Sequence, residues 1–156
     1  MTLEEKVAQA LKSRRKTLAV AESCSGGLLS HRLTNIPGSS KFLKFTLVAY
    51  SYEAKTKLLK VPAAILKKFG AVSRQVASVM AGNARKIFDT DFSVAITGIA
   101  GPTGATRYKP VGLVYISVSS RNKTQTHEFI FKGNRLAIKQ AAVTKALRLL
   151  LNALKR

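Results

Sequence analysis

The sequence predicts a three-layer α/β domain in which helices cover both faces of a mixed β-sheet. Short apolar runs at residues 17–21, 42–50 and 92–97 alternate with segments of helical periodicity. Two further strand-like runs, 111–119 and 124–131, are joined by a short polar turn and form a predicted hairpin. Alternation of strands and helices favours parallel strands with helices on both faces, and the hairpin adds antiparallel strands, so the sheet is expected to be mixed.

The expected helices are marked by apolar spacing and by residues typical of helix starts. Thr2 is expected to cap a helix over 3–11, and Ser73 one over 74–88. Three shorter helices are expected over 28–33, 51–59 and 63–69. Asn134 is expected to cap a long last helix with a buried apolar stripe made of Leu136, Val143, Leu147, Leu150 and Leu154.

Length and composition favour one cytoplasmic globular domain over 1–156. The chain has 156 residues, of which 46% are hydrophobic, enough for a core without metals or disulfides. Cys24 is the only cysteine, and with only His31 and His127 besides it, neither a disulfide nor a metal site is expected. No apolar run is long enough to span a membrane, and the acidic, lysine-containing start does not resemble a secretory signal.

The charge is the unusual feature of the composition. Lys and Arg number 27 against 7 Asp and Glu, a net charge of +20. Such an excess attracts polyanions, including nucleic acid. The basic residues are spread along the whole chain, however, and form no block of 5–8 cations. Nucleic acid is therefore the less favoured partner, and a generally basic surface is the preferred interpretation.

Candidate chemistry lies in the polar loops that follow the predicted strands, because ligands bind at the carboxyl ends of strands in α/β sheets. With few acids and no well-placed histidine, a hydrolytic site would need a hydroxyl activated by a neutral lysine. Lys55 could pair with Ser51 on one helix face, or with Ser40 across a strand. A solvated Lys55 and a helix-capping Ser51 are the structural alternatives. Cys24 is expected to be a small buried filler rather than a nucleophile.

Six segments of the chain resemble the C-terminal domain of the competence/damage-inducible (CinA) family, whose members include nicotinamide mononucleotide deamidases. They are AESCSGGLL at 21–29, PGSS at 37–40, YSYEAK at 50–55, GAVS at 70–73, TGIAGP at 97–102 and KPVG at 109–112. The resemblance implies hydrolysis of the nicotinamide mononucleotide carboxamide to nicotinate mononucleotide and ammonia, without cofactor or metal. The family's longer members carry an N-terminal pyrophosphatase domain, which this chain is expected to lack.

The resemblance also implies roles for individual residues. The nucleophile maps to Ser40, its lysine base to Lys55, and further catalytic positions to Tyr50 and Thr97. Arg135 resembles an arginine suited to a substrate phosphate. The remaining expected substrate contacts are Glu22, Ser23, Cys24, Ser25, Gly26, Gly27 and Gly98.

Two alternatives to this activity stay open. The charge, and Tyr52 at a position where the family commonly has Asn, leave room for a non-catalytic module that binds a nucleotide or nucleic acid. The other alternative is deamidation of a different small amide. The expected partner is a small nucleotide, and no association with a membrane is expected. The sequence does not decide the oligomeric state, and a homo-oligomer is possible.

Overall fold

The computed structural model describes residues 1–155 and shows a single α/β domain. In chain order, its first half holds α1 (Leu3–Ser13), β1 (Leu18–Glu22), α2 (Leu28–Thr34), the 3₁₀ turn η1 (Ser39–Lys41), β2 (Leu43–Val48), α3 (Tyr52–Leu59) and α4 (Ala63–Phe69). Its second half holds α5 (Arg74–Ile87), β3 (Phe92–Gly98), β4 (Leu113–Ser120), β5 (Thr124–Ile130) and α6 (Arg135–Leu154).

The sheet is mixed, as the sequence predicts, with strand order β2-β1-β3-β4-β5. Strands β2, β1 and β3 are parallel, and β4 and β5 continue the sheet as an antiparallel hairpin. All five residues of β1 are buried, because both faces of this inner strand are covered. The edge strand β2 instead alternates between half-buried and exposed residues.

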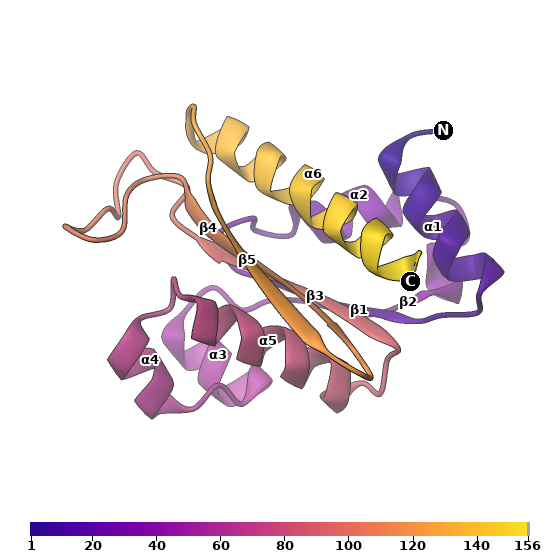
Figure 1. Cartoon of the computed structure of the whole chain (residues 1–156), viewed down its shortest axis with the longest axis horizontal. Coiled ribbons are helices and arrows are strands. Elements are labelled where there is room, and N and C mark those ends of the chain that lie inside the picture. The colour runs from indigo at the N-terminus through magenta and orange to yellow at the C-terminus, as the bar shows by residue number, and fades with distance from the viewer. Residues whose placement is uncertain (156) are drawn as a thin grey trace.

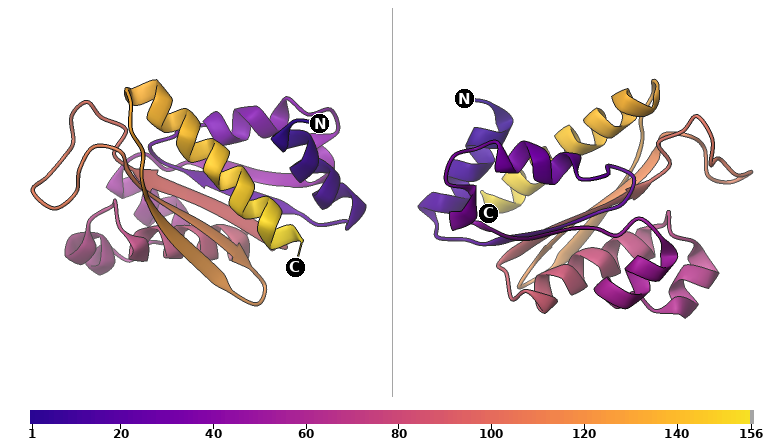
Figure 2. Two further views of the ribbon diagram at one scale, coloured as in Figure 1. Left: turned by 45° about the horizontal axis from the view of Figure 1, so that its top comes forward. Right: turned by 180° about the vertical axis from the view of Figure 1, so that it is seen from behind.

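The helices form two layers, one on each face of the sheet. Helices α1, α2 and α6 lie on one face, and α3, α4 and α5 on the other (Figures 1 and 2). The larger part of the core lies under α1, α2 and α6, where Leu29, Ile116 and Leu147 are among the fully buried side chains. A smaller cluster around Leu59 and Met80 packs beneath α3, α4 and α5.

The expected helix caps are present, and one expected core residue is not buried. Thr2, Ser73 and Asn134 each accept a hydrogen bond from the first turn of their helix. Leu136, expected on the buried stripe of α6, is instead 70% exposed. The periodicity is correct, but the first turn of α6 reaches past the core, and the stripe is covered only from Ile138 onward.

The connection between β3 and β4 stands away from the body of the domain (Figures 1 and 2). Two main-chain hydrogen bonds close its base, from Ile99 N to Leu113 O at 2.9 Å and from Gly112 N to Ile99 O at 2.8 Å. Gly112 is required here, because a Cβ at this position would lie 1.9 Å from the carbonyl oxygen of Phe131. The start of this connection borders the site described next.

Candidate functional site

A cavity lies where the three parallel strands end. Glu22 at the end of β1 is in register with Val48 of β2 and Ile96 of β3, so the segments after these strands converge at one edge of the sheet. The cavity has a volume of about 280 Å³. Its walls are Ser23, Cys24, Tyr50, Lys55, Ala71, Val72, Thr97, Gly98, Ile99, Ala100, Gly101, Thr103, Gly104 and Arg135. This is the position at which α/β sheets bind their ligands.

A buried lysine and a serine meet inside this cavity. Lys55 is only 1% exposed, and its Nζ donates to the Oγ of Ser23 at 2.9 Å. It also donates to the carbonyl oxygen of Ala49 at 2.7 Å and approaches that of Tyr50 at 3.4 Å. The structure therefore pairs Lys55 with the serine that directly follows β1.

The local sequence explains how Lys55 reaches this position. Ser51, three residues after the end of β2, caps α3, and its Oγ accepts from the backbone N–H of Ala54 at 3.0 Å. Lys55 lies one helical turn further on, so its side chain points back toward the strand ends. Ser51 is thus a helix cap, and the alternative pairing of Ser51 with Lys55 is not formed.

Burial changes the protonation of Lys55. Desolvation lowers the pKa of Lys55 from 10.5 to about 8, because a charged ammonium is disfavoured away from water. A substantial fraction of neutral amine is then available near physiological pH. A neutral amine at 2.9 Å from a serine hydroxyl can take its proton, which is the geometry of a Ser/Lys nucleophile pair.

The expected pairing of Ser40 with Lys55 is wrong for this structure. Ser40 lies on the exposed η1 turn before β2, whereas Lys55 follows the other end of that strand. A strand of six residues spans roughly 20 Å, so Ser40 and Lys55 lie at opposite ends of β2. Ser40 does not line the cavity, and its carbonyl oxygen accepts from Lys44 at 2.9 Å.

The structure brings four other expected residues to the cavity. Tyr50 follows β2, and its hydroxyl accepts from the guanidinium of Arg135 at 3.1 Å. Arg135 also donates to the carbonyl oxygen of Gly101 at 2.7 Å, which fixes the start of α6 against the loop after β3. Thr97, 1% exposed, donates its hydroxyl to the carbonyl oxygen of Ala71 at 2.9 Å, and Gly98 follows it in the wall.

Glu22, expected to contact substrate, instead holds the first loop together. Its buried carboxylate accepts from Ser25 Oγ at 2.7 Å, from the N–H groups of Leu29 and Ser30 at 2.9 Å, and from Ser30 Oγ at 2.6 Å. Both of its oxygens are therefore occupied, and it does not line the cavity. The role of Glu22 is to attach the loop to the start of α2.

Three further loop residues expected at the substrate also lie outside the cavity walls. Ser25 is fully buried and bonded to Glu22. Gly26 and Gly27 have φ of +61° and +94°, left-handed conformations that favour glycine and that turn the chain from β1 into α2. These residues shape the loop and so position Ser23 and Cys24, which do line the cavity.

Cys24 has the character of a buried filler, as expected. It is 7% exposed, and burial raises the pKa of its thiol to about 12. A thiol with that pKa is protonated at neutral pH and is a poor nucleophile.

Some site residues escape sequence reasoning. Ala71 and Val72 reach the cavity from the turn before α5, within the GAVS segment at 70–73. Thr103 and Gly104 come from the connection after β3. Their sequence does not single them out: Ala71 and Val72 lie within the GAVS segment, and Thr103 and Gly104 directly follow the TGIAGP segment at 97–102. Ser23 was expected as a substrate contact, and its place directly after a buried strand was the available sign of a larger role.

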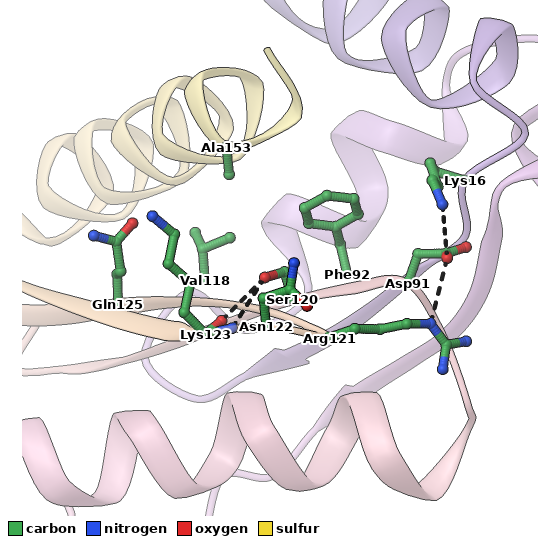
Figure 3. Close-up of a pocket in the computed structure, with 10 residues that line it drawn as sticks. All are labelled: Lys16, Asp91, Phe92, Val118, Ser120, Arg121, Asn122, Lys123, Gln125 and Ala153. Carbon is green, nitrogen blue, oxygen red and sulfur yellow. Dashed lines mark hydrogen bonds and ion pairs between the residues drawn. The ribbon is translucent and has the colours of Figure 1, made fainter. Parts of the chain in front are cut away.

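A second cavity of about 350 Å³ lies at the opposite edge of the sheet (Figure 3). Two of its three cations are paired with an acid, because Asp91 lies 3.2 Å from Lys16 and 3.6 Å from Arg121. Phe92, Val118 and Ala153 supply an apolar lining. Unlike the cavity at Lys55, it contains no hydroxyl bonded to a buried base, so we assign the chemistry to the cavity at Lys55.

Within residues 1–155, no cluster of three or more His, Cys, Asp or Glu side chains has the geometry of a metal site. The same part of the chain contains no helix that is both long and apolar enough to span a membrane.

Comparison with known proteins identifies the family to which this fold belongs. The model of the CinA C-terminal domain matches residues 1–154. The chain belongs to this family. A competence-damage inducible protein of Caldicellulosiruptor saccharolyticus is 50% identical over 94% of this chain, which corresponds to 36% of that relative's length. The chain thus spans about a third of the curated relatives that it matches.

Solved structures of the family share the whole architecture. The competence/damage inducible protein CihA from Agrobacterium tumefaciens is 39% identical with a TM-score of 0.95, covering 99% of this chain and 94% of that one. The competence or damage-inducible protein from Enterobacter asburiae is 37% identical with a TM-score of 0.94, covering 97% and 96%.

Proposed function

We propose that this CinA-family domain is an amidohydrolase that converts nicotinamide mononucleotide and water to nicotinate mononucleotide and ammonia. The observation that carries the hydrolytic part is the 2.9 Å contact between the Nζ of buried Lys55 and the Oγ of Ser23. The choice of substrate follows from the family resemblance. It agrees with a cavity that has neutral hydroxyls inside and Arg135 at its wall.

In the proposed mechanism, Lys55 acts as base in its neutral form. The carbonyl oxygens of Ala49 and Tyr50 accept the two amine protons, which leaves the lone pair directed at the Ser23 hydroxyl. Lys55 takes the hydroxyl proton while Ser23 Oγ attacks the carboxamide carbon. The resulting ammonium gives this proton to the amide nitrogen, the C–N bond breaks, and ammonia leaves.

The second half of the cycle releases the acid. The first half leaves an ester between Ser23 and the nicotinoyl carbon. A water molecule loses a proton to neutral Lys55 and attacks this ester, and the same proton returns to Ser23 Oγ as nicotinate mononucleotide forms. Lys55 therefore ends each cycle neutral, and the net consumption is one water per amide.

The tetrahedral intermediate needs donors for its oxyanion. The backbone N–H of Cys24 directly follows Ser23, and both residues line the cavity. We assign the Cys24 N–H this role. Thr97 is a positioning residue, because its hydroxyl donates to the Ala71 carbonyl and so connects β3 to another part of the cavity wall.

The test is ammonia release from nicotinamide mononucleotide by the purified protein, with nicotinate mononucleotide measured in equal amount. We expect wild type to release both and Lys55→Met to release neither at a detectable rate. Lys67→Met, which removes an exposed lysine of α4, is the matched control and should keep wild-type activity. A folded wild-type protein that binds the nucleotide but releases no ammonia would contradict the proposal.

A further inference from the structure

We propose that Tyr52 and Lys109 are positioning residues that clamp residues 69–72, the segment that brings Ala71 and Val72 into the cavity wall. The inference rests on the proposed function, because it concerns how the substrate is held in that cavity. Neither Tyr52 nor Lys109 is among the residues that line the cavity, so each acts through the main chain of this wall segment.

Side chains from three different elements bind the main chain of the wall segment. The N–H of Ala71 donates to the Tyr52 hydroxyl at 3.2 Å, and the Ala71 carbonyl accepts from Thr97 at 2.9 Å. The ammonium of Lys109 donates to the carbonyl of Phe69, the last residue of α4, at 2.5 Å. After α4 the segment is neither helix nor strand, so its polar groups depend on such partners. The wall segment is thereby tied to α3, to β3 and to the β3–β4 connection.

Gly70 allows both side chains of the clamp to approach the wall segment. A Cβ on Gly70 would lie 3.0 Å from the Nζ of Lys109 and 4.0 Å from the hydroxyl oxygen of Tyr52. The φ of Gly70 is +76°, a left-handed conformation that favours glycine. The two polar groups therefore lie over the same point of the main chain, where a larger residue would place its side chain.

Tyr52 connects the wall segment to the helix that carries the base. It is the first residue of α3, and Lys55 follows three residues later in the same helix. The Tyr52 side chain is 56% exposed, so its hydroxyl rather than its packing makes the connection. The contact with Ala71 therefore fixes the distance between the helix of the base and the wall that holds the substrate.

Lys109 is itself held in place and makes a charge-assisted hydrogen bond. The Thr106 N–H donates to the Lys109 carbonyl at 2.9 Å, and the Lys109 N–H donates to Thr106 Oγ1 at 3.1 Å. Partial burial lowers the pKa of Lys109, and no acid of residues 1–155 forms an ion pair with it. Since hydrogen bonds from a charged donor are stronger than neutral ones, the bond to Phe69 is the firmer half of the clamp.

Steady-state kinetics with nicotinamide mononucleotide test the clamp. Tyr52→Phe should raise KM about fivefold and Lys109→Met about tenfold, because each frees part of the wall segment. The kcat should be nearly unchanged in both variants, since the contact between Ser23 and Lys55 is left intact. Lys109→Arg should restore most of the affinity, because a guanidinium can also donate to the Phe69 carbonyl.

The pH profile separates an effect on the wall from an effect on Lys55. The pH at which kcat/KM levels off should be the same in Tyr52→Phe as in wild type. Tyr108→Phe is the matched control for the lost hydroxyl, because Tyr108 is 82% exposed, and Lys67→Met is the control for the lost exposed lysine; both should behave like wild type. A displaced pH profile or a much lower kcat in Tyr52→Phe would show that Tyr52 acts on the base, and would overturn the inference.

Amide hydrogen exchange distinguishes failure of the clamp from failure of the proposed function. In the ligand-free protein, Tyr52→Phe should raise the exchange rate of the Ala71 N–H about threefold or more, as measured by NMR, and Tyr108→Phe should leave it unchanged. This comparison needs no turnover, so it tests the clamp even if wild type releases no ammonia. An unchanged exchange rate in Tyr52→Phe, or an active enzyme whose KM neither clamp variant alters, would contradict the inference.

Discussion

The depressed pKa of Lys55 has a consequence for folding stability. The folded protein holds this lysine with a pKa of about 8, whereas the unfolded chain would have the ordinary value of 10.5. Between these values the unfolded state binds more protons, so the free energy of unfolding must rise with pH. Below about pH 8 the folded state carries a buried ammonium, and the associated destabilisation is fully present.

The size of the effect follows from the two pKa values. Protonation linkage with pKa values of 8 and 10.5 gives a gain in stability of about 2.5 kcal/mol between about pH 7 and about pH 10. Lys55→Met removes the titrating group and keeps most of the side-chain volume. The difference in unfolding free energy between wild type and this variant should therefore shift by about 2.5 kcal/mol in favour of wild type over that range.

Urea unfolding of both proteins at the two pH values measures this shift. The absolute effect of the substitution also includes the hydrogen bonds lost at Ala49 and Tyr50, but these contribute equally at both pH values. Lys67→Met controls for the loss of one positive charge, because Lys67 stays exposed to water in the folded protein. If the difference in unfolding free energy between wild type and Lys55→Met stays constant with pH, Lys55 does not have the lowered pKa on which the mechanism depends.

Three further predictions concern the same site. The kcat/KM for nicotinamide mononucleotide should rise about tenfold per pH unit up to about pH 8 and then level off, because neutral Lys55 is the base. Ammonia assays that give the same kcat/KM across this pH range would contradict the prediction. Glu22→Gln should lower the free energy of unfolding by roughly 2–3 kcal/mol in urea titrations, because an amide cannot accept all four hydrogen bonds; an unchanged midpoint would contradict its anchoring role. Cys24 should resist iodoacetamide in the folded protein at neutral pH, as followed by mass spectrometry, because its thiol pKa is about 12; rapid alkylation would show an accessible thiolate.

Much of the fold could be predicted because local signals agree with the packing. The apolar run at 17–21 becomes the fully buried β1, displaced by one residue to Leu18–Glu22. The caps at Thr2, Ser73 and Asn134 mark true helix starts. Leu136 was wrongly expected in the core, because periodicity indicates which face of a helix is apolar but not whether other elements cover the first turn of that helix.

The sequence placed the candidate site at the strand ends and named Lys55, and it paired this lysine with Ser40, whereas in the structure Lys55 contacts Ser23. Strand ends pointed to the correct edge of the sheet, and Lys55, Tyr50, Thr97 and Arg135 all reach the cavity. Spacing could not decide which serine Lys55 meets, because Ser23 is 32 residues away and contacts it only across the β1–β2 pairing. Ser40 is nearer in sequence, yet the straight strand β2 separates it from Lys55.

The +20 charge is only partly explained by the site. Arg135 lines the cavity, and burial rather than neighbouring charge accounts for the lowered pKa of Lys55. The lowered pKa of Lys55 therefore does not depend on the basic surface. The other cations are spread along the whole chain.

The central claim is that Ser23, and not Ser40, is the nucleophile activated by Lys55. The most direct measurement is the rate of ammonia release from nicotinamide mononucleotide by Ser23→Ala and Ser40→Ala, compared with wild type. Ser23→Ala should lose at least about a thousandfold in kcat, because the attacking oxygen is removed, while Ser40→Ala should stay close to wild type. An active Ser23→Ala together with an inactive Ser40→Ala would contradict the account.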